Sequence, residues 1–299
     1  MPHGHVPARA ALLICIAVSC FATLDTGVKY LTQRYPIPFL VWARYLIWAV
    51  AMLLTIAPTM RLELVKTRQL KLQIARGALL LCSSLCFVTA LKSLPVAEAT
   101  ALNFLAPVLV VILSVLVLGE RLTGPRMAMI GAGFAGMLLI VRPGTQVFQG
   151  AALLALATAG LYATFQIMTR KLAGEDSRVT AFYPAMVGTL LMTLGLPWFQ
   201  FPAQMAWPDV ALLVGVGLLG TFGHFLFIRA FQHAPASAVT PFTYLQLVWA
   251  TLAGWAAFGN FPDPPALAGM AVIAGGGLLV ALRERALAQA VVKEPLTVD

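Results

Sequence analysis

Residues 95–125 read "PVAEATALNFLAPVLVVILSVLVLGERLTGP", and residues 235–265 read "PASAVTPFTYLQLVWATLAGWAAFGNFPDPP". Each stretch begins with proline, has threonine five residues later and glycine twenty-four residues later, and ends on proline. Aligned at an offset of 140, residues 90–139 and 230–279 share eleven identities in fifty positions. A second match pairs "AALL" at 10–13 with "AALL" at 151–154, at an offset of 141. We therefore interpret the two halves of the chain as copies of one duplicated segment.

The composition predicts a membrane protein. Of the 299 residues, 60% are hydrophobic and 10% are charged, and the mean hydropathy is +0.88. Soluble domains carry about 25% charged residues, and a folded surface of this size cannot hide so much apolar area. Long unbroken apolar runs favour helices over the alternating strands of a membrane barrel. The predicted fold class is an all-α polytopic membrane protein.

Ten apolar runs are long enough to cross a bilayer, which takes about 20 residues for a hydrocarbon core of about 30 Å. The predicted spans are residues 11–31, 38–58, 75–92, 96–118, 124–141, 150–170, 179–200, 208–229, 236–258 and 264–282. They form a first five-helix repeat at 11–141 and a second at 151–282, and residues 283–299 are predicted to be a cytoplasmic tail.

The basic residues predict the orientation of these spans, because cytoplasmic segments are enriched in Lys and Arg. With the N-terminus in the cytoplasm, fifteen Lys and Arg residues fall in inner segments, Arg76 among them, and four fall in outer segments. Five spans per repeat make the second copy enter the membrane upside down. "GERLTGPR" at 119–126 then faces the cytoplasm, and its counterpart "GNFPDPP" at 259–265, without Lys or Arg, faces outward. The sequence predicts two inverted-topology repeats with both termini cytoplasmic, in contact with the lipid bilayer and with no nucleic acid.

Two glycine motifs raise an alternative, a dinucleotide site. "GAGFAG" at 131–136 and "GVGLLG" at 215–220 fit G-x-G-x-x-G, but both lie inside apolar runs rather than after a strand. Small residues there are typical of close helix packing. Inverted repeats are a common plan of secondary transporters, and the alternative, a membrane-embedded enzyme, would need a cluster of acids, metal ligands or a nucleophile with its base. We expect no enzyme, no metal and no cofactor.

The same motifs resemble a known family. The ten spans in two repeats, the "P-x-x-x-A/V-T…G-E" pattern of the fourth span and "LGERLTG" at 118–124 resemble the drug/metabolite transporter superfamily in its EamA-type ten-helix branch. Within that branch the chain is most similar to the aromatic amino-acid exporters. The resemblance implies movement of small metabolites by alternating access without bound nucleotide. The second-repeat counterpart of the motif, "FGNFPDP" at 258–264, lacks the glutamate, so no role is carried over for that residue.

Charged residues inside the predicted spans are candidates for coupling or gating. A charge deep in lipid costs about 2.5–3.5 kcal/mol and normally faces a cavity or a partner. Asp25 and Arg44 lie inside spans, and Lys29 follows Asp25 by one helical turn. The alternatives are that Lys29 and Arg44 reach the outer headgroups, and that Asp25 forms a structural pair with Lys29.

Polar and aromatic residues of the spans are candidates for binding substrate, because aromatic walls with a few hydrogen-bonding groups suit amphipathic solutes. These candidates are Asn103, Tyr162, Gln166, His224, Tyr244, Gln246 and Trp249. For His224 the alternative is a core histidine bonded to a neighbouring helix. Four other tryptophans are assigned to the interfacial belts instead: Trp42, Trp48, Trp198 and Trp207.

The function expected from these features is a secondary transporter in a bacterial-type inner membrane. We expect it to export neutral or aromatic amino acids by alternating access through a central cavity, as a monomer. The alternative within the superfamily is an exporter of other amphipathic metabolites, drugs or organic cations.

Overall fold

A computed structural model describes residues 8–119, 123–142, 150–172, 174–233 and 242–293, which form helices and short connections. The helices of these ranges are α1 Ala8–Thr32, α2 Ile37–Thr55, α3 Ala57–Met60, η1 Arg61–Val65, α4 Leu70–Ser93, α5 Val96–Asn103, α6 Ala106–Leu118, α7 Gly124–Val141, α8 Gly150–Lys171, α9 Ser177–Leu194, η2 Leu196–Trp198, α10 Trp207–His233, α12 Leu245–Phe258 and α13 Pro264–Lys293. The all-helical fold class is confirmed.

Seven helical segments in the described ranges are long and apolar enough to cross a membrane, and two shorter apolar helices accompany them. The seven correspond to the predicted first, second, third, fourth, sixth, eighth and tenth spans, with α5 and α6 together forming the fourth. The shorter pair, Met127–Val141 and Leu245–Phe258, occupies the fifth and ninth. The seventh coincides with α9, which belongs to neither group. The count of ten spans therefore stays a prediction.

Two predicted boundaries differ from the helices observed. Helix α4 begins at Leu70 rather than at residue 75, and Arg76 within it is only 2% exposed. Its guanidinium donates to Thr169 of α8 and to the Thr180 carbonyl of α9, and its assignment to an inner segment stays a prediction. Helix α13 continues to Lys293, eleven residues beyond the predicted end of its span.

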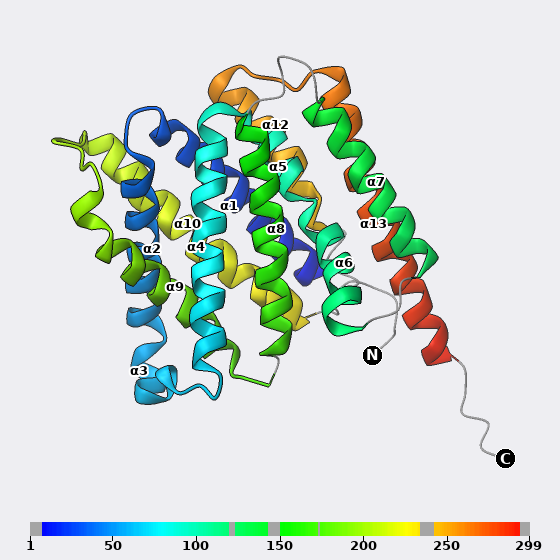
Figure 1. Ribbon diagram of the computed structural model, residues 1–299, viewed down its shortest axis with the longest axis horizontal. Coiled ribbons are helices and arrows are strands. Elements are labelled where there is room, and N and C mark those ends of the chain that lie inside the picture. The colour runs from blue at the N-terminus through cyan, green and yellow to red at the C-terminus, as the bar shows by residue number, and fades with distance from the viewer. Residues whose placement is uncertain (1–7, 120–122, 143–149, 173, 234–241, 294–299) are drawn as a thin grey trace.

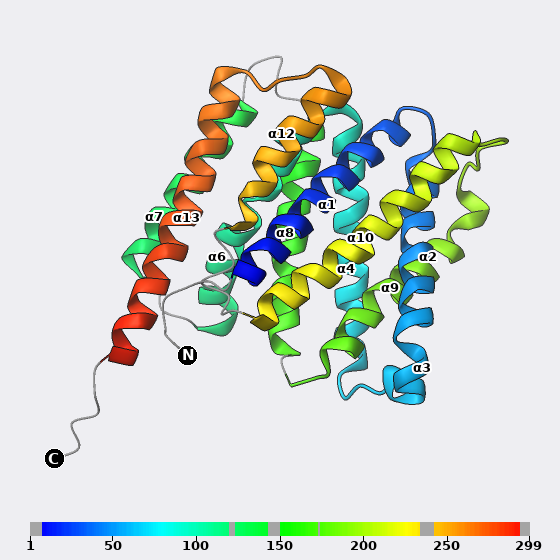
Figure 2. The same ribbon diagram turned by 180° about the vertical axis from the view of Figure 1, so that it is seen from behind.

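The packing of the helices follows the duplication. α1 packs along α10, and α8, at the matching place in the second repeat, packs along α4. In the same way α2 contacts α10 while α9 contacts α4, and α7 packs along α13. Figures 1 and 2 show these neighbours from opposite sides, with α1 and α8 running in opposite directions across the molecule.

The two duplicated stretches, 95–125 and 235–265, each contain a helix break. In the first repeat, α5 ends at Asn103 and α6 begins at Ala106. In the second, Tyr244 interrupts the helix before α12, and it stands 140 residues after Phe104. The second halves, α6 and α12, end on Gly119 and Gly259, whose φ values of 69° and 71° favour glycine. The helix break and the terminal glycine are therefore present in both repeats.

The glycine motifs serve packing. A Cβ on Gly136 would lie 2.6 Å from the Gly269 carbonyl oxygen of α13, and one on Gly217 would lie 2.8 Å from Ile47 of α2. Small residues at such contacts let two helix backbones approach closely. Because both glycines sit inside packed helices, the dinucleotide interpretation does not apply to them.

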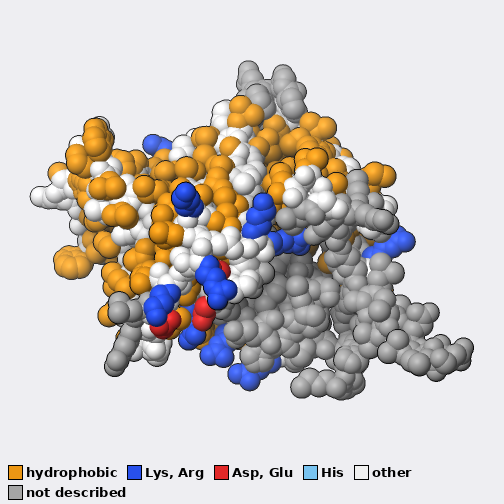
Figure 3. Space-filling view, turned by 60° about the horizontal axis from the view of Figure 1, so that its bottom comes forward, with side chains coloured by type: hydrophobic (Ala, Val, Ile, Leu, Met, Phe, Trp, Pro, Cys, Tyr) orange, Lys and Arg blue, Asp and Glu red, His pale blue; other side chains and the backbone are white. Residues whose placement is uncertain are grey.

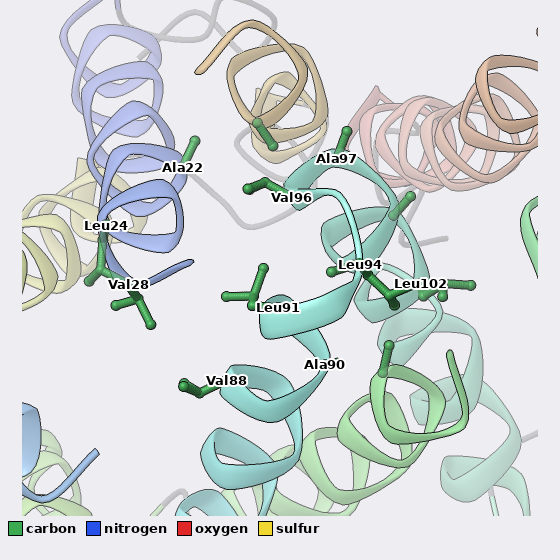
Figure 4. Close-up of a cluster of buried hydrophobic side chains, with 14 of the residues drawn as sticks. Ala22, Leu24, Val28, Val88, Ala90, Leu91, Leu94, Val96, Ala97 and Leu102 are labelled. Carbon is green, nitrogen blue, oxygen red and sulfur yellow. The ribbon is translucent and has the colours of Figure 1, made fainter. Parts of the chain in front are cut away.

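The largest apolar core joins α1 to the junction between α4 and α5. Figure 4 shows Leu24 and Val28 of α1 facing Val88 and Leu91 of α4, beside Val96 at the start of α5. The same core includes Ala155 of α8 and Leu247 of α12, so it joins the two repeats.

The end of the molecule that carries η1 and the α8–α9 connection is polar. Figure 3 brings this end forward and shows Lys and Arg side chains with Asp and Glu among them. The contacts here include an ion pair between Lys66 and Glu63, and Arg178 to Asp176 at 2.7 Å. Basic side chains at one end are typical of the cytoplasmic face of a membrane protein.

Candidate functional site

A charged cluster lies where α1, α2 and α10 meet. Asp25 of α1 is 9% exposed, and Arg44 of α2 is half-buried. Arg44 interacts electrostatically with both Asp25 and His224 of α10. No direct ion pair joins Asp25 to Arg44 in the described chain, so each charge keeps capacity for another partner.

Aromatic rings flank the histidine of this cluster. The Phe21 ring centroid lies 4.9 Å from that of His224, and the Trp48 ring stacks on His224 at 5.9 Å with an interplanar angle of 12°. His224 itself is exposed. Within the described ranges no hydrogen bond ties it to a neighbouring helix, which was the alternative to a role in binding.

Lys29 contacts the end of α4 and not Asp25. Its ammonium donates to the carbonyl oxygens of Leu91 and Leu94 at the end of α4, and it lies 5.4 Å from the Phe258 ring centroid. The last carbonyls of a helix have no partner within it, and a cation there satisfies them. Lys29 is 6% exposed. The structural pair between Asp25 and Lys29 and the reach of Lys29 to the headgroups are therefore both wrong.

The two helix breaks bring a second group together. The Phe104 ring lies 5.2 Å from the Tyr244 ring, one from each repeat. Asn103, beside Phe104, has a buried Oδ1 without a hydrogen-bond partner among the described residues. The Tyr244 hydroxyl lies directly over Gly277 of α13, where any Cβ would overlap it. The sequence candidates Asn103 and Tyr244 are thus close together at the breaks.

Tyr162 and Gln166 of α8 occupy the repeat positions of Phe21 and Asp25, at the offset of 141. The Tyr162 ring stacks on Phe165 at 5.7 Å and packs against the apolar cluster at the start of α6. Gln166 is half-buried. Among the described residues, no hydrogen bond, ion pair or ring contact joins either of them to the charged cluster.

Trp249 is on the exposed face of α12. It is 44% exposed and shares one face of α12 with exposed Leu245, Val248 and Leu252, whereas Leu247 and Ala250 on the opposite face are buried. Gln246 is half-buried next to this face. An exposed apolar stripe of this kind is typical of a surface that faces lipid, and a role for Trp249 in binding stays a prediction.

Sequence reasoning missed two aromatic members of the charged cluster. It assigns Trp48 to the interfacial belt and gives Phe21 no role. The repeat offers a signal for Phe21, because it aligns with the candidate Tyr162. Nothing comparable identifies Trp48, whose contact with His224 joins residues far apart in the chain.

The charged cluster combines three chemistries in one place. A carboxylate can receive an ammonium group, a guanidinium can receive a carboxylate, and aromatic rings offer π-faces to a flat or cationic group. The helix breaks add unpaired hydrogen-bonding groups of the kind that discontinuous membrane helices present to a ligand. A small amphipathic molecule with charges of both signs suits the cluster.

Comparison with known families identifies the repeat directly. The sequence profile of the EamA-like transporter family matches residues 8–142 and again residues 149–282. One solved structure superposes on 94% of this chain and 99% of its own, with a TM-score of 0.65 at 21% identity, which supports the fold alone.

Curated relatives are transporters of different solutes. The chain is 28% identical to the S-adenosylmethionine uptake transporter of Rickettsia prowazekii, over 74% of each chain. It is 28% identical to the riboflavin transporter of Vibrio cholerae, over 90% of this chain and 91% of that one. It is 24% identical to the pseudopaline exporter CntI of Pseudomonas aeruginosa, over 88% and 92%. These relatives support the family without supporting the aromatic amino-acid exporters as its branch.

Proposed function

Because the chain belongs to the EamA-like transporter family, we propose that this membrane transporter carries a small zwitterionic metabolite with an aromatic or heteroaromatic group, an amino acid in the first instance. The observation that carries the proposal is the charged cluster: Asp25 and Arg44 interact without forming an ion pair. Fixed charges of opposite sign that are not paired with each other complement a molecule that bears both.

The mechanism proposed is binding of the solute's two charges and its ring by different side chains. The Asp25 carboxylate accepts hydrogen bonds from the ammonium, and the Arg44 guanidinium donates to the carboxylate. The solute's ring then lies beside His224, which Phe21 and Trp48 already hold from two directions. Desolvating a zwitterion in lipid is unfavourable unless both charges are matched, so this arrangement favours zwitterions over singly charged analogues.

We further propose that transport proceeds by alternating access between two inverted repeats. The opposite directions of α1 and α8 and the exchange of helix neighbours between repeats support this plan, which is common among secondary transporters. Cytoplasmic termini and an inner-membrane location belong to the same proposal. Outward flux remains a prediction, because in a secondary transporter net flux follows the gradients of solute and coupling ion.

Lys29 is assigned a gating role in this proposal. It fixes α1 to the end of α4, next to Glu98 of α5, with which it interacts electrostatically. Opening the protein at this end would have to separate these groups. Asp25 is the proposed proton carrier if transport is coupled, since carboxylates inside membrane proteins often serve as relays.

The test is counterflow in liposomes that contain only the purified protein. Labelled phenylalanine outside should accumulate against unlabelled phenylalanine inside, and S-adenosylmethionine or riboflavin added outside reveals whether these solutes compete. Accumulation of amino acid would support the proposal. Transport of riboflavin or organic cations with no amino-acid transport would retain the family and reject the substrate.

A further inference from the structure

Two buried oxygens at the end of α5 have no partner among the described residues. The Thr100 hydroxyl oxygen and the Asn103 Oδ1 are both inaccessible, and neither takes part in a hydrogen bond there. The whole Thr100 residue is only 2% exposed. Residues three apart lie next to each other on a helix surface, so these two side chains share one face of α5. Buried polar atoms are nearly always paired, and two unpaired ones together indicate a ligand.

Thr100 differs from other threonines of the spanning helices. Thr89 of α4 donates to the Leu85 carbonyl at 2.7 Å, and Thr251 of α12 donates to the Leu247 carbonyl at 2.8 Å. This bond to the carbonyl one turn earlier is the usual way to satisfy a hydroxyl in an apolar helix. Thr100 makes no such bond.

The break supplies a third oxygen. In an unbroken helix the Asn103 carbonyl would accept from the residue four positions later, but that residue is Pro107, which has no N–H. After the last regular helical bond, from the Phe104 N–H to the Thr100 carbonyl, the Leu105 N–H donates to the Leu102 carbonyl as the chain tightens into the break. The carbonyl end of α5 also carries the negative end of its helix dipole. These features make the end of α5 a place of neutral acceptors.

We propose that the break between α5 and α6 binds a small monovalent cationic group through Thr100 and Asn103. Sodium ion and a primary ammonium share this chemistry. The three oxygens are neutral, whereas Ca²⁺ and Mg²⁺ sites generally use carboxylates. Unwound carbonyls and half-helix C-termini coordinate monovalent cations in other transporters with broken helices. The site lies on helices other than those of the charged cluster, so it goes beyond the proposed function.

The test measures thermal unfolding of the purified protein in detergent at constant ionic strength. The probes are Na⁺, K⁺, methylammonium and choline, the last being too large and without N–H groups. Wild-type protein should be stabilised saturably by Na⁺ or by methylammonium relative to choline. Thr100→Val, which keeps the shape and removes the oxygen, should weaken that affinity by about tenfold or more.

Matched variants separate loss of the ligand from loss of the fold. Thr251→Val removes a hydroxyl that its own helix already satisfies, and it should leave the cation affinity unchanged. Pro107→Ala restores an N–H that can donate to the Asn103 carbonyl, so it should weaken the affinity while the helix itself is well formed. Pro107→Ala decides the matter if Thr100→Val does not fold.

The outcomes distinguish the two sources of the cation. Stabilisation by Na⁺ identifies an inorganic ion, and stabilisation by methylammonium alone identifies an ammonium group of a solute. Equal stability in all four salts, or a cation effect that persists in both Thr100→Val and Pro107→Ala, would overturn the proposal. Because no transported solute is present, failure here is independent of failure in the amino-acid counterflow.

Discussion

Helix α1, which carries Phe21 and Asp25, packs along α10 and α12, and helix α8, which carries Tyr162 and Gln166, packs along α4 and α6. The frame is the same, since each pair of positions is related by the offset of 141 and the neighbouring helices correspond. The chemistry differs: a carboxylate on one side stands where an amide stands on the other, and Arg44 corresponds at that offset to the fully buried Ala185. Duplication therefore preserved the packing while these ionisable groups were confined to one half.

The largest effect expected concerns the orientation of the two halves. If they are inverted, Asn260 near the end of α12 lies outside the cell and Lys66 of η1 lies inside. In a variant without the four native cysteines, Asn260→Cys should react with an impermeant thiol reagent in whole cells. Lys66→Cys should react only after the membrane is opened, and labelling of Lys66→Cys alone in whole cells would reject the predicted orientation.

Substitutions in the charged cluster of the first repeat should reduce transport far more than substitutions at matching positions of the second repeat. Arg44→Gln removes the guanidinium proposed to bind the solute's carboxylate, and losing one hydrogen bond to a charged group costs about 1.5–3 kcal/mol. Transport of an amino acid, measured as kcat/KM in liposomes, should fall about tenfold to hundredfold. Gln166→Leu on α8 is the control, with an expected change of less than about threefold. Equal losses in both variants, at equal thermal stability, would show that both repeats contribute equally to transport.

The helices could be predicted from the sequence because apolar length and paired glycines are local signals. Gly119 and Gly259, at matching positions of the repeat, indicate where α6 and α12 end. The partners of charged groups could not be predicted in this way. Lys29 contacts carbonyls more than sixty residues away, and Trp48 stacks on a histidine of another repeat. Those contacts depend on tertiary packing, which the spacing of residues along one helix does not encode.

A packing variant should affect stability more than it affects the solute. The Tyr45 ring of α2 lies against Gly188 of α9, so a methyl group at Gly188 would overlap it. Overpacking of this kind costs about 1–3 kcal/mol, and Gly188→Ala should lower the thermal unfolding temperature by several degrees. Gly215→Ala is the control, since open space surrounds its Cβ position. An unchanged transition for Gly188→Ala would mean that α2 and α9 pack less closely than described.

The smallest effect is expected at the connection between α7 and α13. Arg142 donates to Asp263 at 2.6 Å and holds the pKa of that carboxyl below its ordinary value of 3.8. Asp263 thus contributes stability above pH 3.8, and the contribution is lost as the pH falls through the lower folded value. Partly exposed pairs contribute at most about 1 kcal/mol.

Asp263→Asn keeps the acceptor for the Ala266 N–H and removes the charge. The variant at neutral pH should be slightly less stable to thermal unfolding than wild type, and the difference should shrink below pH 3.8. A difference that stays constant down to acidic pH would assign the effect to the cap rather than to the ion pair.

Competition by three analogues tests whether Asp25 and Arg44 together bind a zwitterion. Counterflow of labelled phenylalanine is measured with unlabelled phenylalanine, phenethylamine or phenylpropionate as competitor, in wild type and in Arg44→Gln. The zwitterion should compete at least about tenfold better than either singly charged analogue in wild type. In Arg44→Gln its advantage over phenethylamine should disappear, because the carboxylate has lost its partner. Equal competition by all three in wild type would contradict binding between Asp25 and Arg44.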